Sequence, residues 1–183
     1  MSLPDSPLTM AAIENPLIAT IEGNRFRCYV PFTLAGTVGA TFKYVVRIPS
    51  SPIIVTLDRV WTCDIGGATL QVMASPTTLV AGTQFPNRNL NGLYSSHTSA
   101  VEIRAYTSAA SDGTEVDYDI CPGAGAATPA RSAGPITYGG GSRVYPPGSA
   151  YVIILTNKTS TANFGVVKYE WIEAHCMSDF IGA

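Results

Sequence analysis

Charged side chains are scarce in this sequence. Only 13% of its 183 residues are Asp, Glu, Lys or Arg, about half the share of an ordinary soluble domain. The 11 basic and 13 acidic residues nearly cancel, and the formal net charge is −2. Nucleic-acid binding needs an excess of basic side chains, so we predict no nucleic-acid partner. The low net charge and 46% hydrophobic content also exclude intrinsic disorder.

Long apolar runs and a secretion leader are also missing. No stretch approaches the roughly 18 consecutive apolar residues of a membrane-spanning helix, and the first 20 residues lack the basic and apolar regions of a signal peptide. We therefore expect a protein made in the cytoplasm with no membrane partner. Glu, Lys and Leu are too few to favour a coiled coil or a helix bundle.

Cysteine and histidine are few and widely spaced. The four cysteines are Cys28, Cys63, Cys121 and Cys176, and no two form a CxxC motif. A zinc site would have to be completed by His97 and His175, the only histidines. This pattern favours buried free thiols in a reducing compartment, with a disulfide or an interfacial cysteine as the alternative.

Catalytic motifs are absent as well. The sequence has no GxSxG elbow and only two histidines, and without a general base held by a carboxylate the serines around His97 are loop residues. The glycine run at residues 139–141 lacks the Lys-Ser/Thr pair of a phosphate-binding loop. We therefore predict that the chain is not an enzyme, with no catalytic residue and no cofactor.

The sequence does contain a series of short β-like runs separated by Gly, Pro, Asn and Ser clusters. The predicted strands are residues 25–32, 42–48, 53–63, 68–73, 101–106, 115–121, 151–156 and 164–172, with short ones at 83–85 and 143–145. Alternation is clearest in the first, with Phe26, Cys28, Val30 and Phe32 on one face and Arg25, Arg27 and Tyr29 on the other. The runs at 53–63 and 68–73 flank a turn and predict a hairpin. Residues 74–98 and 122–141 predict long surface connections.

These runs predict an all-β fold. Eight or nine strands without βαβ alternation or an amphipathic helix indicate an antiparallel two-sheet sandwich of jelly-roll or Greek-key type. Residues 1–16 hold three prolines and no periodicity, which predicts an extended N-terminal arm. We expect the sandwich domain at residues 17–173 and a C-terminal tail at 174–183.

Three alternating carboxylates are the most metal-like feature of the sequence. Glu115, Asp117 and Asp119 are expected to project from one face of a strand, and calcium takes several oxygen ligands. One strand, however, supplies ligands in a line and not a cage. The alternatives are a solvent-exposed face or a face toward a basic partner surface, so we predict no metal site and keep these three as its candidates.

The aromatic residues favour packing and protein contact. Trp61 and Trp171 fall on predicted strands, where they pack in the core or between subunits, with a sugar-stacking platform as the alternative. Four tyrosines are expected to be exposed: Tyr29, Tyr44, Tyr106 and Tyr138. Exposed tyrosines on a surface with few charges favour a protein interface. Low charge itself favours a protein that is packed in an assembly.

Three groups of segments carry a family resemblance. They are the start of the body at 14–20, 23–27 and 30–35, the run at 60–69, and the end at 145–151, 155–157 and 168–171. Over residues 14–173 the chain resembles small jelly-roll virion structural proteins of tailed bacteriophages, of the capsid decoration or cement type.

The resemblance implies a decoration protein on the capsid surface of a virion. Such a protein bridges and stabilises subunits of the major capsid protein, and we expect it to self-associate as a dimer or trimer. The alternative is a head-fibre or tail component that binds a receptor or glycan through loops at 86–98 and 122–141. The sequence does not identify the interface residues.

Overall fold

The computed structural model describes residues 24–51, 53–94, 98–121, 140–143 and 145–174. These residues form eleven strands and one short 3₁₀ turn, η1 (Gly92–Tyr94). Within these ranges no helix has the length and apolar character needed to cross a membrane.

Several sequence predictions fall on other residues. They concern the arm at 1–16, His97, Tyr138, His175, Cys176 and most of the tail at 174–183, all of which lie outside the described residues. The tail prediction is one residue too long, because the last strand continues to Ala174.

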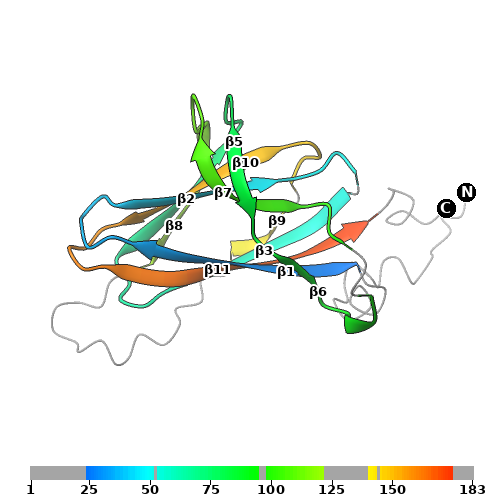
Figure 1. Cartoon of the computed structure of the whole chain (residues 1–183), viewed down its shortest axis with the longest axis horizontal. Helices are drawn as coiled ribbons and strands as arrows, with labels where there is room; N and C mark the ends of the chain where they lie inside the picture. Colours follow the sequence, from blue (N-terminus) through cyan, green and yellow to red (C-terminus); the bar gives the residue numbers. More distant parts are fainter. Residues whose placement is uncertain (1–23, 52, 95–97, 122–139, 144, 175–183) are drawn as a thin grey trace, which may run out of the picture.

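The strands form two antiparallel sheets, drawn in Figure 1. The five-stranded sheet has the order β6 (Asn87–Asn89), β1 (Arg25–Leu34), β11 (Asn163–Ala174), β3 (Ile53–Cys63) and β9 (Gly140–Arg143). The six-stranded sheet has the order β5 (Val80–Gln84), β7 (Glu102–Ser108), β2 (Thr41–Arg47), β10 (Ala150–Asn157), β4 (Ala68–Ala74) and β8 (Thr114–Cys121). The predicted all-β sandwich is confirmed.

The connectivity is that of a jelly roll. The chain alternates between the sheets from β1 to β4 and again from β8 to β11. The pairs β1–β11, β2–β10, β3–β9 and β4–β8 are therefore nested, as when one long hairpin is rolled around a core. Strands β5, β6 and β7 are an insertion between β4 and β8 that extends both sheets. Of the two topologies left open by the sequence, the structure has the jelly roll.

Two predictions about connections are wrong. The runs at 53–63 and 68–73 do not form a hairpin, because β3 and β4 belong to different sheets. Gly66 and Gly67 both have positive φ, 75° and 65°, and redirect the chain from one sheet to the other. The connection at 74–98 contains β5 and β6 where one short strand was expected. The three-residue β6 is too short to give a periodic signal and depends on its pairing with β1.

The core between the sheets is apolar and closely packed. The inward face of β1 is buried as its alternation predicts. Trp61 and Trp171 are fully buried, so neither offers a sugar-stacking surface. The prediction of an exposed Tyr44 is wrong, because its ring is buried and its hydroxyl lies 2.7 Å from that of Tyr169. That hydrogen bond satisfies both phenols in the apolar interior.

Candidate interaction surface

Strand β8 turns apolar side chains toward solvent and acidic side chains toward the opposite sheet. It is the last strand of the six-stranded sheet, and among the described residues it pairs with β4 alone. Its outward side chains Val116, Tyr118 and Ile120 are 55%, 44% and 53% exposed. Its acidic residues Asp117 and Asp119 are half-buried on the other face. We call the three outward residues the apolar stripe.

A β-bulge separates the three candidate metal ligands. Asp117 lies opposite Val72, but the register then shifts and Glu115 lies opposite Met73. Glu115 therefore points outward, where its carboxylate accepts a 2.5 Å hydrogen bond from the Gln71 amide. The expectation that all three carboxylates share one face is wrong for Glu115. No three metal-ligating side chains converge anywhere in the described part of the chain.

Asp117 and Asp119 are held by a cation from the opposite sheet. Arg59 of β3 is 6% exposed, and its Nη2 donates to Oδ2 of Asp117 at 2.9 Å and of Asp119 at 2.5 Å. Burial alone would lower the pKa of Arg59, but the adjacent phenols and Asp119 hold it above the ordinary value. The guanidinium therefore stays charged, and this ion cluster ties β8 to the five-stranded sheet.

The ion cluster explains why the apolar stripe points to solvent. Side chains alternate along a strand, so turning the two aspartates inward toward Arg59 turns Tyr118 and Ile120 outward. Inward-pointing charges on an edge strand also oppose indiscriminate strand pairing. The stripe is therefore fixed in place by a buried ionic contact.

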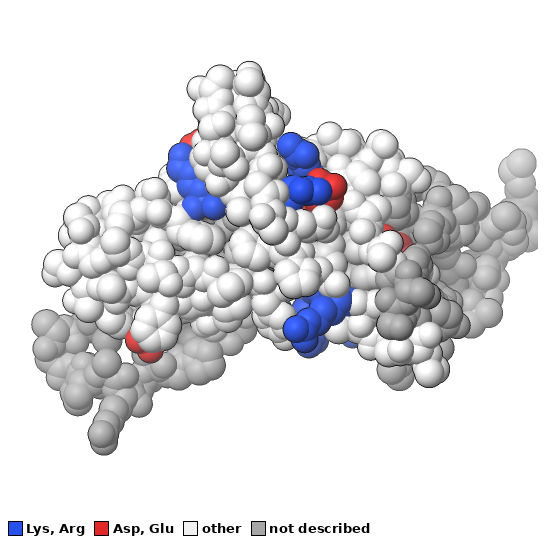
Figure 2. All heavy atoms as spheres, in the orientation of Figure 1, with Lys and Arg blue, Asp and Glu red and all other residues white. Residues whose placement is uncertain are grey.

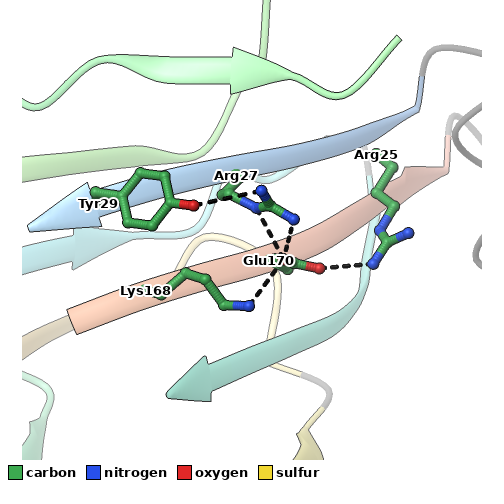
Figure 3. A network of polar contacts seen from close by, with 5 residues as sticks. All are labelled: Arg25, Arg27, Tyr29, Lys168 and Glu170. Carbon is green, nitrogen blue, oxygen red and sulfur yellow. Dashed lines mark hydrogen bonds and ion pairs between the residues drawn. The ribbon is translucent and has the colours of Figure 1, made fainter. Parts of the chain in front are cut away.

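A second surface lies on the outer face of the five-stranded sheet. Figure 3 shows Glu170 of β11 surrounded by three cations from β1 and β11. Its carboxylate lies 2.6 Å from Arg25, 2.5 Å from Arg27 and 3.1 Å from Lys168. Burial would raise the pKa of Glu170, but the hydrogen bonds from these cations outweigh it and the pKa is lowered. Tyr29 extends the network by accepting a 3.3 Å hydrogen bond from Arg27.

Cross-strand register places two more charged residues beside this network. Arg88 of β6 lies opposite Arg27, and Asp58 of β3 lies opposite Glu170. Four cations against two carboxylates leave a formal charge of +2 on this face. Figure 2 shows basic side chains gathered beside β1 and β6. We call the group of Arg25, Arg27, Arg88 and Lys168 the basic face.

The outer face of the six-stranded sheet carries three cations and two carboxylates where β2 and β7 meet, including Arg47 at 3.7 Å from Glu102. Lys43 lies 2.5 Å from Asp112, which also accepts a hydrogen bond from Tyr106. Glu102 pairs with Arg104 at 2.9 Å. Tyr106 was predicted to be exposed, but it is half-buried in this polar contact. Tyr29 is 40% exposed, as predicted.

Sequence reasoning identified some of these residues and missed others. The alternation of β1 placed Arg25, Arg27 and Tyr29 on an outward face, as the structure does. It missed Arg59, because the sequence around Asp58 and Arg59 carries no local signal of the residues that these charges contact. Comparisons with protein-family models, curated proteins and solved structures gave no match to this chain.

Proposed function

We propose that this chain is a structural protein of a tailed-bacteriophage virion, a capsid decoration (cement) protein that bridges subunits of the major capsid protein. The observation that carries the proposal is the apolar stripe on a sheet edge. The inward-pointing aspartates of β8 oppose indiscriminate strand pairing, but its outward side chains Val116, Tyr118 and Ile120 remain exposed. Such an edge suits a partner that adds a strand and covers the stripe.

A bridging role requires two separate contact surfaces. The apolar stripe belongs to the outer side of the six-stranded sheet, and the basic face belongs to the outer side of the five-stranded sheet. The two therefore lie on opposite sides of the sandwich, where they suit different neighbours. Many modest contacts repeated over a lattice can hold a shell together without a tight single contact.

The resemblance noted in the sequence supports the same role. Capsid proteins, lectins and cupins all use the jelly roll, so the fold is compatible with a virion protein but does not select one. We propose the major capsid protein as the partner, self-association as a dimer or trimer, and the capsid surface as the location.

The test is co-sedimentation of the purified chain with phage heads assembled without it. A Tyr118→Ser/Ile120→Ser variant should bind at least about tenfold more weakly, because burying one large apolar side chain contributes about 1.5–3 kcal/mol. The matched control is Val38→Ser/Leu93→Ser, which removes two side chains that are 63% and 92% exposed elsewhere. This control should bind like the wild type.

Two results would count against the proposal. Equal binding by the Tyr118/Ile120 variant would exclude the stripe as the docking surface. Binding to host cells with none to heads would replace the decoration role with that of a fibre or tail component that recognises a receptor or glycan.

A further inference from the structure

Two cysteines meet where the sheets join. Cys63 is the last residue of β3 in the five-stranded sheet, and Cys121 is the last residue of β8 in the six-stranded sheet. Cys121 lies opposite Ala68, which the chain reaches directly after crossing between the sheets from Cys63. The two thiols hydrogen-bond to each other, and both are free.

The pair is chemically unlike the third described cysteine. The hydrogen bond from Cys63 lowers the pKa of Cys121 to about 7, and the same contact together with burial raises the pKa of Cys63. The pair therefore shares one proton near neutral pH, with thiolate character on Cys121. Cys28 is fully buried in the core, and burial raises its pKa to about 12. A thiolate is the reactive form of cysteine, so reactivity is concentrated in the pair.

We propose that Cys63 and Cys121 are an oxidation site that forms a disulfide between the two sheets when the protein meets a small-molecule disulfide such as oxidised glutathione. The Cys121 thiolate accepts the proton of the hydrogen-bonded Cys63 thiol, and the half-exposed Cys63 sulfur attacks the oxidant, forming a mixed disulfide and displacing one glutathione thiolate. Cys121 passes this proton to the released glutathione. The Cys121 thiolate then attacks the Cys63 sulfur and displaces the second glutathione. Overall two S–H bonds and one S–S bond break, one protein S–S bond and two glutathione thiols form, and two electrons pass to the oxidant.

The cross-link would join elements that no hydrogen-bond ladder connects. Strands β3 and β8 lie in different sheets, and the Arg59 ion cluster also joins them. A disulfide closing a loop of this size restricts the unfolded chain and stabilises the fold. The bond would form after the protein leaves a reducing cytoplasm for an oxidising medium. This inference rests on the thiol contact and does not require the proposed function.

The experiment uses the full chain with Cys176→Ser, which limits alternative pairings. After oxidised glutathione treatment, unreduced peptide mapping by mass spectrometry should identify a Cys63–Cys121 link in monomeric protein. The oxidised form should melt roughly 5–15 °C above the reduced form.

Single variants supply the controls. Cys121→Ser should retain glutathione on Cys63 and show no rise in melting temperature. Cys63→Ser should form no intramolecular link and should likewise show no rise. The proposal is overturned if the treated parent protein keeps both thiols alkylatable or carries only glutathione adducts. It is also overturned if the rise in melting temperature on treatment is the same in the parent and in Cys121→Ser.

Discussion

Arg59 is the residue on which the orientation of β8 depends. Its guanidinium is the cation shared by Asp117 and Asp119, and all three are largely withdrawn from water. Breaking a fully buried ion pair from one side costs about 3–5 kcal/mol. Asp119 retains 24% exposure, so we expect Arg59→Met to lower the free energy of unfolding by about 2–4 kcal/mol.

Urea denaturation measures this loss directly. The triple variant Arg59→Met/Asp117→Asn/Asp119→Asn removes the uncompensated carboxylates and should recover part of the stability. If Arg59→Met unfolds within about 0.5 kcal/mol of the wild type, the ion cluster does not hold β8 in place.

Glu170 sets the pH dependence of the basic face. Its pKa is lowered in the folded protein from an ordinary value of 4.5. A carboxylate of this kind contributes stability that is fully present above 4.5 and is lost as pH falls through the folded pKa. We expect the melting temperature of the wild type to fall with acidification below about pH 4.5, and Glu170→Gln to fall less steeply.

The same variant also has an effect at neutral pH. Without the carboxylate, Arg25, Arg27 and Lys168 repel one another, so Glu170→Gln should melt below the wild type at pH 7. Melting curves at several pH values show both effects. Parallel curves for the two proteins from pH 7 to strongly acidic pH would mean that Glu170 makes no pH-dependent contribution.

At the scale of elements, the contact between β11 and β3 leaves no room at Gly165. A Cβ atom there would lie 1.9 Å from the carbonyl oxygen of Thr62 and 2.7 Å from the ring of Phe32. We expect Gly165→Ala to cost about 1–3 kcal/mol, the range of overpacking, as measured by urea denaturation. Gly92→Ala is the control, since its Cβ would meet nothing within 4 Å. Equal stability of the two variants would contradict this packing.

Most of the strands could be predicted from local pattern. The three-residue β6, the bounds of β5 and β9, and several pairings between strands could not. The alternation of inward and outward side chains is visible within a single segment, so the buried face of β1 was correctly predicted from Phe26 and Val30. Whether β3 and β4 pair or cross between sheets depends on the strands that lie beside each of them, and a turn at Gly66 and Gly67 is compatible with both. The sequence therefore suggested a hairpin where the fold has a crossing.

The candidate site also combines a pattern that is visible in the sequence with contacts that only the fold creates. The acidic alternation of β8 was visible in sequence, but the bulge opposite Val72 and Met73 moved Glu115 to the other face. The partner of the two aspartates is Arg59, which is 58 residues away from Asp117 in the chain. Contacts at that separation are created by the fold, so neither the ion cluster nor the Cys63–Cys121 contact had a local signal.

At the scale of the whole molecule, the jelly roll holds the apolar stripe and the basic face on opposite sides of one rigid sandwich. A protein that bridges subunits needs this separation, because each side meets a different neighbour. In the proposed role, the stripe would contribute apolar area on a strand that pairs with β4 alone among the described residues, and the basic face would complement the charge of an acidic partner. Occupancy of a repeating lattice is the property that separates this role from that of a fibre or tail part.

The most direct measurement is therefore the number of copies bound per phage head. Heads assembled without the chain are saturated with purified protein and pelleted, and the bound chain is quantified against the major capsid protein. A decoration protein should reach hundreds of copies per head, and Tyr118→Ser/Ile120→Ser should lose most of them. A dozen copies or fewer, or none, would contradict the proposed decoration role.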